Sequence, residues 1–151
     1  MLIGIAAVIV AILLVILLPA HSSGGPSVTP ATTAAWRAWL ARLNPHLAGF
    51  YRDYAVTGSS LTGGDRSSAR AEFQRLSRDA ASFMGLANSV DPAVNSALTT
   101  FAGNVGNLSA SGLRRWPSID VPAFERAVRA YERSVSELTR TITAASRRYS
   151  G

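Results

Sequence analysis

Apolar and polar positions repeat along residues 31–149 with the period of an α-helix, most regularly at the carboxyl-terminal end. Between Phe124 and Tyr149 the apolar positions follow one another at alternating steps of 4 and 3 residues. This spacing places them on one side of a helix, as in the seam of a coiled coil. The pattern therefore predicts one amphipathic helix over Val121 to Tyr149. Its seam consists of Phe124, Val128, Tyr131, Val135, Leu138, Ile142, Ala145 and Tyr149.

Three earlier segments carry similar stripes, from about Ala31 to Val56, from Ser67 to Asn88 and from Pro92 to Leu108. No window shows the long strict alternation that is typical of a strand. Four amphipathic helices with short connections are typical of a helical bundle. The sequence therefore predicts an all-α fold, with an antiparallel four-helix bundle over residues 34–151.

The expected connections are rich in glycine, serine and proline. TGSSLTGGD (57–65) and SASGLRRWPSID (109–120) are both expected to be loops. Asp91 and Asp120 precede helical segments and are expected to be their N-caps. The first stripe keeps its phase across Pro45, which favours one kinked helix over two separate helices.

Residues 1–20 contain no charged and no polar side chain. As a helix, the apolar run from Leu2 to Leu18 spans about 25 Å, close to the ~30 Å hydrocarbon core of a bilayer. A cleavable signal peptide would need a positive amino-terminal region and a shorter apolar core. The segment is therefore expected to be a retained transmembrane signal-anchor, and the protein would be secreted only if the leader were cleaved.

Residues 21–33 are uncharged and rich in serine, glycine, proline and threonine, which is typical of a flexible linker. The first charged side chain is Arg37. The positive-inside rule gives only a weak cytoplasmic bias here, whereas the linker favours an extracytoplasmic domain. We expect a single-pass protein of the cell membrane with its domain outside the cytoplasm. A cytoplasm-facing, membrane-tethered scaffold is the alternative.

The composition excludes several kinds of site. The chain has no cysteine, so it has no disulfide, thiolate metal site or cysteine nucleophile. His46 is isolated, and Asp53 lies two helical turns away, about 10 Å and beyond hydrogen-bond reach. His46 is therefore expected to be an exposed polar residue. The sequence predicts no catalytic residue, no metal site and no cofactor, and hence no enzyme.

The net charge is +6, and every basic residue is an arginine. Arg126, Arg133, Arg140 and Arg147 are spaced by seven residues, and Arg129 lies beside them. If the apolar seam faces the core, these side chains form a ladder on the outer face of the helix. Such a ladder is suited to anionic lipid headgroups, an acidic polymer or an acidic protein. Nucleic acid is disfavoured, because the net charge is modest.

The competing interpretation of this ladder is an ordinary solvated face. Outer positions of a helix must be polar, and a chain without lysine uses arginine there. Glutamates also dilute the positive charge, and two pairs at i,i+4 spacing are expected: Glu125 with Arg129, and Arg133 with Glu137.

Two further features suggest other contacts. Trp39 and Tyr51 lie off the main apolar stripe and are candidates for an aromatic groove or a membrane-interface contact. Gly103, Gly106 and Met84 could leave room for a lipid or another apolar ligand between helices. The leading function is a membrane-anchored binding or structural module of the cell envelope, such as an accessory subunit of a membrane complex. The ligand-carrying bundle is the alternative.

Overall fold

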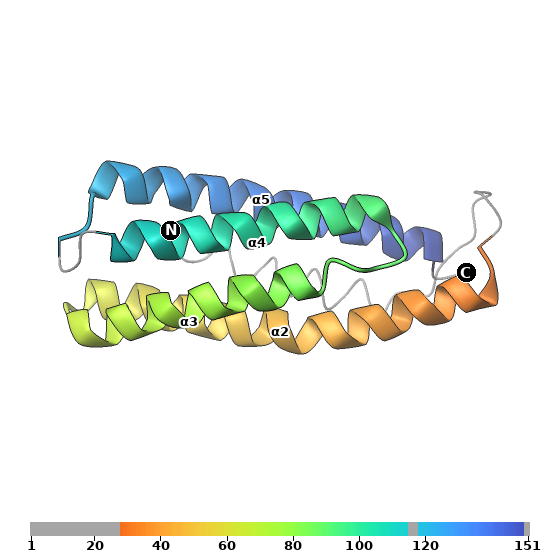
Figure 1. Cartoon of the computed structure of the whole chain (residues 1–151), viewed down its shortest axis with the longest axis horizontal. Coiled ribbons are helices and arrows are strands. Elements are labelled where there is room, and N and C mark those ends of the chain that lie inside the picture. Colours follow the sequence, from red (N-terminus) through yellow and green to blue (C-terminus); the bar gives the residue numbers. More distant parts are fainter. Residues whose placement is uncertain (1–27, 115–117, 150–151) are drawn as a thin grey trace.

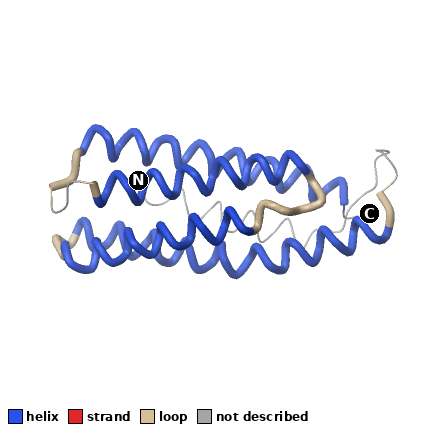
Figure 2. The backbone as a smooth tube through the Cα atoms, in the orientation of Figure 1, coloured by secondary structure: helices blue, strands red, loops and turns tan. Residues whose placement is uncertain are grey.

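The computed structural model describes residues 28–114 and 118–149, which form four α-helices and no strand. Consecutive helices run in opposite directions (Figure 1), and short connections join them (Figure 2). The predicted all-α fold is confirmed, and its four helices are consistent with a four-helix bundle. The helices are α2 (Pro30–Thr62), α3 (Arg66–Gly85), α4 (Pro92–Leu113) and α5 (Val121–Tyr149).

The amino-terminal predictions fall mainly outside this part of the chain. The expected anchor over residues 1–20 lies outside the described residues, as does most of the expected linker over 21–33. Within 28–114 and 118–149, no helix combines the length and apolarity needed to cross a bilayer. Helix α2 already begins at Pro30, so the end of the expected linker is helical.

The start of α2 has a local explanation. The hydroxyl of Thr29 accepts a hydrogen bond from the N–H of Thr32 at 3.2 Å, as an N-cap side chain does. Pro30 takes the first helical position, where its missing N–H costs no intrahelical hydrogen bond. These two residues begin the helix inside a stretch whose composition resembles a linker.

Helix α2 continues through Pro45, as predicted, but it also continues past Val56, so the loop predicted from Thr57 was wrong. The hydroxyl of Thr57 donates to the carbonyl oxygen of Asp53 at 2.8 Å. Such bonds to the preceding turn let serine and threonine remain in a helix. The helix ends before Gly64, whose φ of 74° is a left-handed conformation that favours glycine.

Helix α4 also extends beyond its predicted end at Leu108, because α3 packs against its last turns. The hydroxyl of Ser109 donates to the carbonyl oxygen of Phe73 at 2.6 Å. A Cβ atom on Gly112 would lie only 2.5 Å from the Phe73 ring. Gly112 is therefore required for this close approach and does not break the helix.

The backbones of α2 and α5 approach each other less closely than those of the other neighbouring helix pairs. Large aromatic side chains fill the space between these two helices. The ring of Tyr131 lies 4.9 Å from that of Tyr54 and 5.9 Å from that of Phe50. Nearer the carboxyl-terminal end of α5, the ring of Tyr149 lies 5.5 Å from that of Trp36. Aromatic packing therefore closes the bundle on this side.

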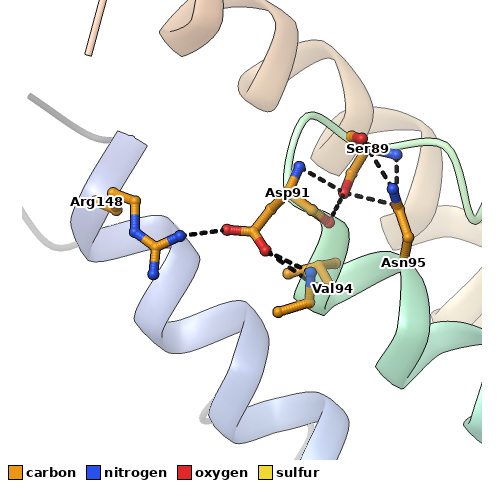
Figure 3. Close-up of polar contacts among 6 residues, drawn as sticks. Ser89, Asp91, Val94, Asn95 and Arg148 are labelled. Atoms are coloured by element: carbon orange, nitrogen blue, oxygen red, sulfur yellow. Dashed lines mark hydrogen bonds and ion pairs between the residues drawn. The ribbon is translucent and has the colours of Figure 1, made fainter. Parts of the chain in front are cut away.

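One buried carboxylate joins the start of α4 to the end of α5 (Figure 3). Asp91 is only 2% exposed, and one of its oxygens accepts hydrogen bonds from the N–H groups of Ala93 and Val94. Its other oxygen pairs with the guanidinium of Arg148 at 2.8 Å. The predicted N-cap of α4 is confirmed, and it also holds the last turn of α5.

Candidate binding surface

The seam of α5 faces the core, and the arginine ladder lies on the opposite face. All five predicted arginines are exposed, and the ladder positions recur every seven residues. This spacing corresponds to about 10.5 Å along the helix axis. The exposed set is Arg126, Arg129, Arg133, Arg140 and Arg147.

The ladder arginines differ in their ion pairs. Arg129 pairs with Glu125, as predicted, at 3.8 Å. The predicted pair of Arg133 with Glu137 is wrong, because both carboxylate oxygens of Glu137 accept hydrogen bonds from Arg140. These bonds are the main reason why the pKa of Glu137 is lowered and that of Arg140 is raised.

Three members of the ladder keep their charge uncompensated within the described part of the chain. Arg126, Arg133 and Arg147 form no ion pair with any residue in 28–114 or 118–149. These three residues are exposed, and each guanidinium carries five N–H donors. They are therefore the strongest candidates for contact with an anionic partner.

A groove of about 350 Å³ runs between α4 and α5 beside the ladder. Glu137 lines this groove and also binds Arg140, so the groove and the ladder share a border. Most of the lining side chains are small or carry a hydroxyl group. The lining residues are Ala93, Ser96, Ala97, Thr100, Ser134, Glu137 and Thr141.

The α4 side of the groove carries no charge. Helix α4 contains no charged residue over its full length, from Pro92 to Leu113. Its exposed positions beside the groove include Ser96 and Thr100. The surface therefore changes from an uncharged wall on α4 to a basic face on α5. The sequence did not predict the groove, because the groove forms only where α4 packs against α5 in the tertiary structure.

Trp39 and Tyr51 lie in the core and not in an exposed aromatic groove. Their exposed fractions are 1% and 7%. The indole N–H of Trp39 donates to the carbonyl oxygen of Leu86 at 2.7 Å, and burial raises the pKa of Tyr51 to about 12. A helix that packs against two neighbours buries more than one narrow stripe, which is why positions off the stripe are buried.

The three residues suggested to leave room for an apolar ligand do not surround a common space. Met84 is 51% exposed. A Cβ atom on Gly103 would have no neighbour within 4 Å, whereas one on Gly106 would meet Ala80 at 3.8 Å. An alanine at position 106 would therefore make an ordinary van der Waals contact with α3, and Gly103 lies at an open position.

His46 is exposed, as expected, and its charge acts on Asp79 of α3, a carboxylate that the sequence did not group with it. Burial, and then the charge of Asp53, raises the pKa of Asp79, while Arg78 and His46 oppose this shift. This electrostatic interaction between residues of α2 and α3 could be found only from the fold. Among the described residues, no three histidine, cysteine, aspartate or glutamate side chains gather as a metal site.

No family model, curated protein or solved structure matches the chain. The geometry of the chain itself therefore remains as the guide to its function. Within that geometry, the basic face of α5 and the groove beside it form the clearest candidate surface.

Proposed function

We propose that this protein is a membrane-tethered, non-catalytic binding module of the cell envelope, and that the basic face of α5 contacts an anionic partner. The observation that carries this proposal is the exposure of all five ladder arginines on one helix face. The apolar run from Leu2 to Leu18 supplies the tether. The uncharged residues 21–29 lie in the sequence between this tether and the first residue of α2.

The uneven distribution of charge supports a contact surface over an ordinary solvated face. Helix α5 holds six arginines and three glutamates, whereas neighbouring α4 holds none of either. If arginine served only for solubility, both outer faces would be expected to carry it. Positive charge concentrated along one helix creates a local field that attracts anions.

A charge-matched comparison tests the partner side of the proposal. The full chain (residues 1–151), purified in mild detergent, is titrated with poly-L-glutamate and with vesicles that contain or lack an anionic phospholipid. The ladder variant changes Arg126, Arg133, Arg140 and Arg147 to glutamine. The control variant changes four exposed arginines of α2 and α3 to glutamine: Arg42, Arg52, Arg70 and Arg78.

Each variant loses four positive charges, so net charge cannot explain a difference in affinity between them. We expect the ladder variant to lose about tenfold or more in affinity for at least one probe, and the control to lose less. Binding by the wild type should weaken with salt, since screening acts over about 8 Å at 0.15 M. Equal losses in the two variants would contradict the proposal.

The tether has a separate test. We expect the native product to retain residues 1–20 and to fractionate with membranes, because the apolar run from Leu2 to Leu18 is longer than the apolar core of a cleavable signal. Intact-mass measurement of the native protein gives the answer directly. A product beginning at or near His21 would show that the anchor is removed.

A second candidate function is a bundle that holds an apolar ligand with a polar group. Two buried donors support it, because the hydroxyl of Tyr131 and the indole N–H of Trp36 have no hydrogen-bond partner among the described residues. Lipid extraction and mass spectrometry of the native protein test for such a ligand. Tyr131→Phe should lower ligand retention if the hydroxyl binds it. If the variant instead retains stability and lipid unchanged, this candidate fails.

A further inference from the structure

The groove between α4 and α5 has the lining of a helix-packing site. Its walls consist mainly of alanine, serine and threonine, including Ala93 and Ala97 on α4 and Ser134 and Thr141 on α5. Small side chains let another backbone approach closely, as they do at helix interfaces. The charged residue of the lining is Glu137 on α5, which pairs with Arg140 of the ladder, whereas the α4 wall is uncharged.

The spacing of the arginines suits a helical partner. Arg126, Arg133, Arg140 and Arg147 recur every seven residues, about 10.5 Å or nearly two helical turns. A second helix running along α5 repeats its own faces at the same interval. Acidic residues at every seventh position of such a helix would each meet an arginine of the ladder.

We propose that the groove and the ladder together bind an acidic amphipathic α-helix of another protein. This inference rests on the proposed function and names its partner class. The small, weakly polar face of the partner lies in the α4–α5 groove, and its carboxylates pair with Arg126, Arg133 and Arg147. Arg140 contributes less, because Glu137 already occupies its guanidinium.

Charge complementarity excludes a second copy as the favoured occupant. The chain carries a net charge of +6, and the face in question is its basic one. Two such faces brought together would place arginine against arginine. Of the three glutamates of α5, Glu125 and Glu137 already pair with Arg129 and Arg140, which leaves one carboxylate, that of Glu132, to offset the arginines of a second copy. A flat bilayer would meet the ladder but would leave the concave groove unfilled.

The test uses two synthetic helical peptides of about four heptads and identical composition. One has glutamate at every seventh position beside an alanine and leucine face, and the isomer has the same residues in scrambled order. Each is titrated against the full chain and its variants by fluorescence anisotropy. Thr100→Trp fills the groove, and Thr99→Trp is its matched control, because Thr99 is also exposed but does not line the groove.

We expect the heptad peptide to bind the wild type and the scrambled isomer to bind about tenfold more weakly. Thr100→Trp and the quadruple ladder variant should each lower the affinity by about tenfold or more. Thr99→Trp and the control arginine variant should change it by less than about twofold. Arg133→Gln should weaken binding more than Arg140→Gln, because Arg140 pairs with Glu137 whereas Arg133 has no ion pair among the described residues.

The outcomes separate the two proposals. If both peptides bind equally, or if Thr100→Trp binds as the wild type does, the helix inference is overturned while an anionic partner for α5 remains. If only anionic vesicles depend on the ladder, the partner is lipid and not a helix. If the ladder and control variants lose poly-L-glutamate and vesicle binding equally, the proposed function fails as well.

Discussion

Helices α4 and α5 bury similar inner faces in one core, yet their outer faces are opposites. Helix α4 has no charged residue, and glycine, serine, threonine and asparagine recur along it. Helix α5 has six arginines and three glutamates. Packing constrains only the inner faces, so it cannot account for this difference.

The two helices are also held in place by different means. Helix α4 is fixed by shape and by its cap, since Gly112 lies under the Phe73 ring and Asp91 caps the first turn. Helix α5 is fixed by its long apolar seam and by Arg148, which reaches Asp91. The outer face of α5 is therefore not needed to hold the helix in place, which makes it the better candidate for a binding surface.

The contact that joins the two helices should give the largest stability effect. Asp91→Ala removes a buried N-cap together with the partner of Arg148, and we expect a loss of about 2–4 kcal/mol in the free energy of unfolding. Asp65→Ala, which removes the exposed cap of α3, should cost only about 1 kcal/mol. Urea unfolding followed by helical circular dichroism compares them. Equal losses would mean that the ion pair with Arg148 adds nothing.

The shape-based packing of α4 gives the next largest effect. Gly112→Ala places a methyl group against the fully buried Phe73 ring, and we expect a net loss of about 1–3 kcal/mol from overpacking. The combined variant Gly112→Ala with Phe73→Leu tests this cause, because the smaller side chain should relieve the clash. If the effect of Gly112→Ala is the same in both backgrounds, Phe73 is not its cause.

A glycine on the open side of α4 should behave in the opposite way. A Cβ atom on Gly103 would meet nothing within 4 Å, so Gly103→Ala removes only the backbone entropy cost of glycine. We expect a gain of up to about 1 kcal/mol in the free energy of unfolding. Thermal unfolding beside Gly112→Ala gives the contrast directly, and a loss at position 103 would show that this face is already packed.

The sequence predicted the elements that its own periodicity defines, and it failed where tertiary contacts decide. Helix α5 has the predicted bounds, because its seam is unbroken from Phe124 to Tyr149. The predicted end of α4 was wrong, because Gly112 resembles a helix breaker until Phe73 is placed above it. The burial of Trp39 and Tyr51 was also not predicted. Both residues lie off the periodic stripe of their helix, and the stripe does not show that a second neighbouring helix covers them.

The candidate surface likewise has one part that the sequence predicted and another that depends on the fold. The exposed ladder followed from heptad positions on one helix, so the sequence was sufficient to predict it. The pair of Glu137 with Arg140, in place of Arg133, depends on side-chain geometry between neighbouring turns. The groove depends on how α4 and α5 pack, which no single-helix pattern contains.

The smallest expected effect is the one on which the functional argument depends. Within the described residues, changing Arg126, Arg133, Arg140 and Arg147 to glutamine removes a single exposed ion pair, that of Arg140 with Glu137. We expect the free energy of unfolding to change by less than about 1 kcal/mol, as for other exposed pairs. Arginines about 10.5 Å apart also repel weakly, and their removal offsets part of the lost pair.

Ionic strength distinguishes the loss of the ion pair from the relief of repulsion between the arginines. At low salt the Debye length exceeds the spacing of the arginines, so repulsion along the ladder is least screened and its removal offsets most of the lost pair. At about 0.15 M salt the repulsion is screened and this offset should shrink, while the total change stays below about 1 kcal/mol. Urea unfolding at both salt concentrations measures the difference. A loss above about 2 kcal/mol would show that the ladder supports the fold, and reduced partner binding by the variant would then say nothing about a contact surface.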